Sequence, residues 1–293
     1  MRFAAAIAIA LVLGLGQALP SQAADGKIAV VAAENAYGDI ASQIGGNRVA
    51  VTSILSNPNQ DPHLFETAPG TVRTLSEAQV VVLNGADYDP WMEKLLKAGP
   101  RAGRAVISAA TLMGRKPGDN PHLWYDPATM PKVAAALADA FSKADPAHAG
   151  DYAARLKTTL AALDRIDARV AQMKAKFAGQ TVTATEPVFG LMTGAIGLKM
   201  RNESFQLSMM NDTEPSARDV AAMEDDLRGR KVKVLIYNSQ VTEKLTERLR
   251  DIAMKAKVPV VGVTETLPAD RIFQDWVLGE LDALDKALSG PNS

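Results

Sequence analysis

The sequence predicts an α/β protein with two parallel-sheet lobes, built from βαβ units and joined by one long rigid helix. Short apolar runs rich in Val, Ile and Thr alternate with helical patterns, which is typical of parallel sheets. A long segment of uninterrupted helical periodicity separates an earlier series of such runs from a later one. With 293 residues, of which 47% are hydrophobic, the chain is long enough for two domains of ordinary size.

The candidate strands fall into two series along the chain. The first series comprises residues 28–33, 49–55, 80–83 and 105–109. The second series comprises residues 182–185, 232–237 and 258–264. Strands that alternate with amphipathic helices in this way pair in parallel, so each series predicts one sheet.

The segment between the two series, residues 146–177, carries apolar residues at steps of three or four from Tyr152 to Met173. This spacing predicts a single helix that would extend roughly 48 Å at 1.5 Å per residue. Gly179 ends it, and the second series begins directly afterwards. We therefore expect an N-terminal lobe over residues 24–145, a spanning helix over 146–177 and a C-terminal lobe over 178–293.

The first 23 residues have the pattern of a cleaved secretory signal peptide. Arg2 precedes an apolar run that ends in the small residues Ser21 and Ala23. The chain contains no cysteine, which excludes disulfides, thiolate metal sites and an acyl anchor attached to a cysteine. These features predict a periplasmic location without a lipid anchor.

Charge and motifs exclude several classes of function. Removal of Arg2 with the signal peptide would leave a net charge of −2 and no basic stripe, so we expect no nucleic-acid partner. The sequence lacks a phosphate-binding loop, a His-Glu-x-x-His helix, a nucleophile elbow and a dinucleotide fingerprint. We therefore expect a binding protein rather than an enzyme.

Two of the three histidines are candidate metal ligands. His63 and His122 each stand in a Pro-His-Leu loop that precedes a helix in the first lobe. Neutral imidazole is the commonest transition-metal ligand, so we expect both to bind a metal ion. His148 lies at the start of the long helix among Ala and Gly, where we expect a solvated helix residue.

Two neutral imidazoles do not complete a divalent site, so the second lobe should supply anionic oxygens. Glu186 and Glu265 each follow a predicted strand. Ligands of open α/β sheets collect in the crevice beyond the carboxyl ends of the strands, which would bring both glutamates to the cleft between the lobes. Together with His63 and His122 they would form a neutral shell for a divalent ion.

Several stretches resemble the TroA-like solute-binding proteins, the metal-receptor family of ABC uptake systems. The similar stretches are residues 61–63, 80–91, 120–124, 214–216 and 258–268. The resemblance implies two lobes on one rigid helix and one Zn²⁺, Mn²⁺ or Fe²⁺ ion held by four side chains, one after each of four strands. By position these side chains correspond to His63, His122, Glu186 and Glu265. It also implies delivery of the ion to an ABC transporter membrane permease.

The sequence departs from this family pattern in two places. Zinc receptors of the family usually carry a third histidine where this chain has the stretch 185–189, and often a histidine-rich loop that is absent between Gly99 and Asn120. The fourth ligand is commonly an aspartate, whereas Glu265 is one methylene longer. Glu214 and Asp212 are the alternative carboxylates for that position.

The residue types favour manganese narrowly over zinc, with iron as a further candidate. Two imidazoles and two carboxylates form a harder shell than three imidazoles, and a glutamate can bind through both oxygens. We expect a monomer that binds one such ion. Two alternatives stay open: a receptor for a chelated or organic solute on the same architecture, and a periplasmic metal-dependent hydrolase.

Overall fold

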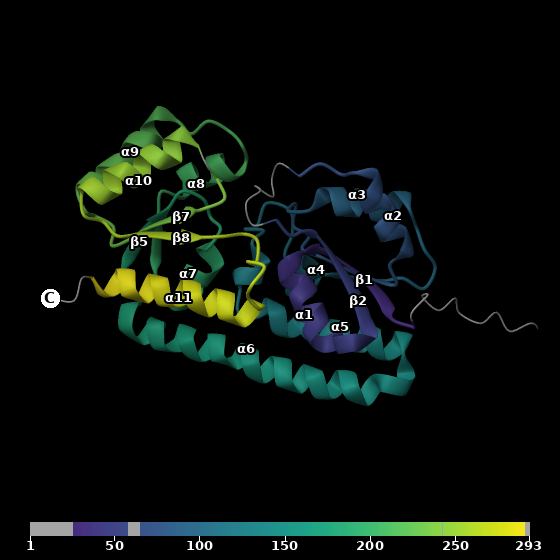
Figure 1. The fold of residues 1–293 in the computed structure, drawn as a ribbon. Helices are drawn as coiled ribbons and strands as arrows, with labels where there is room; N and C mark the ends of the chain where they lie inside the picture. Colours follow the sequence, from purple (N-terminus) through teal and green to yellow (C-terminus); the bar gives the residue numbers. More distant parts are fainter. Residues whose placement is uncertain (1–25, 58–64, 242, 291–293) are drawn as a thin grey trace, which may run out of the picture.

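A computed structural model of the chain describes residues 26–57, 65–241 and 243–290. The predicted signal peptide and His63 lie outside these residues. Within the described residues, no helix is both long and apolar enough to cross a membrane. The described chain folds into two α/β lobes that lie side by side above one long helix (Figure 1).

The N-terminal lobe contains a parallel four-stranded sheet in the order β2-β1-β3-β4. Its strands are β1 (Ile28–Glu34), β2 (Val49–Leu55), β3 (Val80–Leu83) and β4 (Ala105–Ser108). One face packs on α2 (Pro69–Glu77) and α3 (Pro90–Ala98), and the other on α1 (Asn35–Gly45) and α5 (Thr129–Ala144). The short helices α4 (Ala109–Met113) and η3 (Leu123–Tyr125) follow β4. Since β3 is buried on both faces, its sequence is an unbroken apolar run.

The C-terminal lobe repeats this plan with the strand order β6-β5-β7-β8, again parallel throughout. The strands are β5 (Thr181–Ala184), β6 (Lys199–Arg201), β7 (Leu235–Asn238) and β8 (Val260–Val263). The helices α8 (Glu203–Met210), α9 (Ala217–Arg228) and α10 (Lys244–Lys255) pack around a core of their own on one face. On the other face lie α7 (Gly190–Ile196) and α11 (Phe273–Ser289).

The spanning helix α6 (Ala149–Phe177) follows one turn of 3₁₀ helix, η4 (Pro146–His148). It packs against α5 and α1 in the first lobe and against α11 and α7 in the second. Its buried residues, from Tyr152 to Phe177, belong to one apolar core that continues through both lobes. Because bending α6 would break this shared core, the helix connects the lobes rigidly.

The predicted fold class is confirmed, including both parallel sheets and the long helix. The ends of several strands differ by one to three residues from the prediction. Strand β6 was not predicted because it has only three residues, Lys-Met-Arg, and lies at an edge of its sheet. Three residues, of which only Met200 is apolar, are too few to establish an alternating pattern.

Candidate metal site

The described candidate ligands lie where the carboxyl ends of the two sheets face each other. His122 immediately precedes η3, Glu186 follows β5 by two residues, and Glu265 follows β8 by two residues. All three are buried, with exposed fractions of 0%, 4% and 1%. Buried ionisable side chains are retained when they are paired or coordinate a metal ion.

His122 and Glu265 come together across the two lobes. The distance from His122 Nε2 to Glu265 Oε2 is 3.4 Å. Two donor atoms that each bind one ion at about 2.1 Å lie about 3.4 Å apart when their angle at the ion is about 108°. The observed separation therefore suits two ligands of one transition-metal ion.

The neighbours of His122 determine which ring nitrogen faces Glu265. Asn120 Oδ1 lies 2.9 Å from His122 Nδ1, and Asn120 Nδ2 donates to the carbonyl of Pro187 at 2.7 Å. Because that carbonyl can only accept, the amide oxygen of Asn120 faces the ring and Nδ1 carries the hydrogen. With its hydrogen on Nδ1, the ring of His122 presents Nε2 toward Glu265, and Nε2 is the atom that a metal ion would bind.

Hydrogen bonds fix the carboxylate of Glu265 from both lobes. Tyr88 Oη donates to Oε2 at 2.7 Å, and Asn238 Nδ2 donates to Oε1 at 2.6 Å. The side-chain carbonyl of Gln240 accepts from the backbone N–H of Glu265 at 2.5 Å. Asn238 Nδ2 also donates to Glu186 Oε2 at 3.2 Å, so one amide links the two glutamates.

A strained turn after β3 brings Tyr88 to the site. Gly85, Ala86 and Asp87 have positive φ angles of 77°, 52° and 65°. The carboxylate of Asp89 stabilises this turn by accepting the backbone N–H of Asn84 and of Gly85, both at 2.7 Å. Left-handed backbone costs about 1 kcal/mol or more at a residue with a Cβ, so the turn persists because these bonds hold it.

The same turn supports the loop that carries His122. Asn84 Nδ2 donates to the carbonyl of Pro121 at 2.7 Å, and Tyr37 Oη donates to Asn84 Oδ1 at 2.6 Å. Beneath it, burial and the nearby Asp89 raise the pKa of Glu34 well above its usual value. This shift favours the neutral form of the Glu34 carboxyl group.

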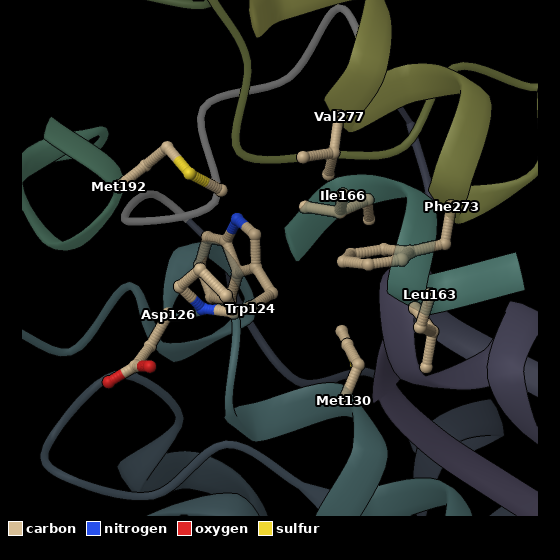
Figure 2. A pocket seen from close by; sticks show the side chains of 9 residues that line it. Trp124, Asp126, Met130, Leu163, Ile166, Met192, Phe273 and Val277 are labelled. Atoms are coloured by element: carbon tan, nitrogen blue, oxygen red, sulfur yellow. The ribbon is translucent and has the colours of Figure 1, made fainter. Parts of the chain in front are cut away.

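Aromatic rings enclose His122. Tyr88 and Trp124 lie edge-on to the imidazole, with ring centroids 5.8 Å and 5.5 Å away. Behind Trp124, a small pocket lies where α5, α6, α7 and α11 meet (Figure 2). Its lining is apolar apart from Asp126, whose carboxylate turns away from the indole and accepts from Arg115. This pocket gives no ligands for a cation and forms part of the interlobe packing.

A second buried polar cluster joins the lobes beside the site. Tyr125 Oη lies 2.6 Å from both Glu280 Oε2 and the carbonyl of Thr264, while Glu280 Oε1 accepts from Thr264 N and Trp276 Nε1. Burial raises the pKa of Glu280 to about 8. A protonated Glu280 accounts for both short contacts of Tyr125, since the acid donates to Oη and the hydroxyl donates to Thr264.

The structure brings together some of the predicted ligands. His122 and Glu265 are adjacent, and Glu186 is linked to Glu265 through Asn238. Over residues 26–57, 65–241 and 243–290, no three His, Asp or Glu side chains form a group that could hold a metal ion. His63 lies outside these ranges, so its place in the shell stays a prediction.

The alternative carboxylates lie elsewhere. Asp212 and Glu214 are exposed and line a surface groove of about 300 Å³ with Met209, Glu243 and Leu245. That groove contains none of the three described ligands.

Four residues that position the ligands were not predicted: Tyr88, Asn120, Asn238 and Gln240. A signal was present for one of them, because Asn238 ends β7, whose carboxyl end opens on the same cleft.

Comparison with known proteins relates the whole fold to one family. A family model described as zinc-uptake complex component A periplasmic, ZnuA, matches residues 30–287. The manganese-binding lipoprotein MntA of Bacillus subtilis is 27% identical over 242 residues, which cover 79% of this chain and 77% of MntA. The zinc-binding protein TroA of Treponema pallidum is 24% identical over 278 residues, which cover 91% of this chain and 88% of TroA. The solved structure of TroA has a TM-score of 0.75 at 20% identity and covers 90% of this chain and 99% of its own.

Proposed function

Because the chain belongs to the ZnuA family of periplasmic zinc-uptake components, we propose that it captures one Mn²⁺ or Zn²⁺ ion between its lobes and delivers it to the membrane permease of an ABC importer. Relatives are described as binding manganese, zinc or iron. Fe²⁺ is therefore a further candidate cargo.

We propose His63, His122, Glu186 and Glu265 as the ligands. The observation that carries this assignment is the 3.4 Å approach of His122 Nε2 to Glu265 Oε2 across the lobes. Tyr88 and Asn120 hold these two groups in place, as outer partners commonly do in metal sites. The ion would then bind to atoms from both lobes, which stabilises the arrangement in which His122 and Glu265 face each other.

Delivery requires the ion to leave when the receptor docks on the permease. The rigid α6 and the shared core oppose a wide hinge opening, so we propose that release involves small lobe rotations and local movement of the ligand loops. The mature protein acts as a periplasmic monomer without a lipid anchor, without catalytic activity and without a nucleic-acid partner. Cell fractionation tests the periplasmic location, and light scattering of the mature protein tests the monomeric state.

Competitive metal titration of chelator-stripped protein tests the function. Wild-type protein should bind one equivalent of Mn²⁺ or Zn²⁺ tightly, and His63→Ala and His122→Ala should each lose most of that affinity. The matched control is His148→Ala, since His148 pairs with Asp145 at the start of the spanning helix and not with a proposed ligand. Tight binding retained in both ligand variants contradicts the assignment. Hydrolysis by the metal-loaded protein would instead favour an enzyme.

A further inference from the structure

We propose that Asn238 is a specificity-determining residue: its amide prevents Glu186 and Glu265 from both binding the ion through two oxygens. This proposal rests on the proposed function, because it concerns the same metal site. Asn238, a neutral side chain that does not bind the ion itself, would then control how many glutamate oxygens bind the ion.

Asn238 is the last residue of β7 and is only 1% exposed. Its Nδ2 donates one hydrogen to Glu265 Oε1 at 2.6 Å and the other to Glu186 Oε2 at 3.2 Å. Its Oδ1 accepts the backbone N–H of Gln240 at 3.1 Å. Since a backbone N–H can only donate, this last bond fixes the amide with its nitrogen toward the glutamates.

The amide geometry sets the distance between the two oxygens that it binds. The two N–H bonds of a planar amide diverge by about 120°, which places their acceptors here about 5 Å apart. Two oxygens on one transition-metal ion lie at most about 4.4 Å apart, because each bond is at most about 2.2 Å. Glu265 Oε1 and Glu186 Oε2 therefore do not both bind one ion while Asn238 holds them.

The glutamates can then give the ion three oxygens at most. Glu265 Oε2 is the first of these, because it faces His122 Nε2 at 3.4 Å. With two imidazoles, the shell holds at most five protein donors. Two doubly bound glutamates would have supplied six, the number that an octahedral Mn²⁺ site requires. Zn²⁺ accepts four or five donors, so the restriction acts against manganese.

This restriction opposes the preference for manganese that the residue types alone suggest, because that preference assumes glutamates that bind through both oxygens. Asn238 also supports both carboxylates, because its amide donates a hydrogen bond to each of them. Loss of the amide should therefore weaken zinc binding and relieve the restriction on manganese. The ratio of the two dissociation constants is the quantity that distinguishes this role from simple structural support.

The test compares Asn238→Ala with wild type by competitive titration of Mn²⁺ and Zn²⁺ on stripped protein. The ratio Kd(Mn)/Kd(Zn) should fall by about tenfold or more, a size typical for groups that support metal ligands. Asn47→Ala is the matched control, because Asn47 is exposed in a short 3₁₀ turn (Gly46–Arg48) of the first lobe. Asn238→Leu, which fills the same volume without donors, provides the ratio if the alanine variant does not fold.

Equal weakening of both metals, or no change in either, overturns the proposal. A measurement on the wild type is independent of any variant: infrared difference spectra of the Mn²⁺-loaded protein distinguish carboxylates bound through one or two oxygens. Two doubly bound glutamates in those spectra also overturn it. If the wild type binds neither metal, that result overturns the proposed function, on which the role of Asn238 rests.

Discussion

Glu280→Gln should make the stability of the metal-free protein less dependent on pH. Glu280 lies buried between the lobes, and burial raises its pKa from 4.5 to about 8. Between pH 4.5 and about pH 8 this group is ionised in the unfolded chain but still protonated in the folded protein. A carboxyl group whose pKa is raised by folding therefore stabilises the protein at low pH, and this stability is lost as the pH rises. The glutamine side chain is always neutral and can make the same hydrogen bonds to Tyr125, Thr264 and Trp276.

The pKa difference gives the size of the effect. Each unit corresponds to about 1.4 kcal/mol, so Glu280 lowers the free energy of unfolding by about 1 kcal/mol at pH 5 and by about 4 kcal/mol at pH 8, relative to a neutral group. The stability difference between Glu280→Gln and wild type should therefore change by about 3 kcal/mol between these pH values, in favour of the variant at pH 8.

Urea denaturation at several pH values between 5 and 8 measures this difference. A chelator must be present, because a bound ion would stabilise the folded state. The matched control is Glu77→Gln on the exposed surface of α2, whose curve should run parallel to that of wild type. If the curves of Glu280→Gln and wild type are also parallel, the buried neutral acid between the lobes is refuted.

Three further substitutions test the supports of the site and the core. Asn120→Ala removes the bond that fixes the tautomer of His122 and should weaken metal binding by about 10- to 100-fold in a competitive titration; unchanged affinity contradicts the role of Asn120. Tyr88→Phe removes the hydroxyl that donates to Glu265 Oε2 and should weaken binding by about tenfold in the same titration, with thermal stability measured to separate a folding defect. Phe141→Ala should lower the free energy of unfolding by about 3–5 kcal/mol in urea without changing metal affinity, because this ring is fully buried in α5, away from the ligands; a large change in affinity would contradict that separation.

The alternation of strands and helices made both sheets predictable, because parallel strands buried on both faces must be apolar. The long helix was predictable for a similar reason: its buried face repeats every three or four residues from Tyr152 to Phe177. Strand β6 was not predictable, since a strand of three residues with a single apolar side chain is too short to show periodicity. The continuous core shared by both lobes could not be predicted from the sequence either, because it depends on how α11 and α5 both pack on α6.

The approach of His122 to Glu265 followed from a topological rule, that the carboxyl ends of parallel strands meet at one cleft. Their supporting residues did not follow from it. Tyr88 reaches Glu265 across the lobes from the turn after β3, and that pairing depends on the relative position of the two sheets. Asn238 was overlooked because an asparagine at a strand end has many ordinary roles, and only the structure shows its amide between two carboxylates.

The most direct test is a crystal structure of the mature protein loaded with Mn²⁺ or Zn²⁺, with the ion located by anomalous scattering. We predict one ion between the lobes, within about 2.0–2.3 Å of His63, His122, Glu186 and Glu265. An ion bound elsewhere, or one that contacts residues of a single lobe only, would contradict capture between the two lobes.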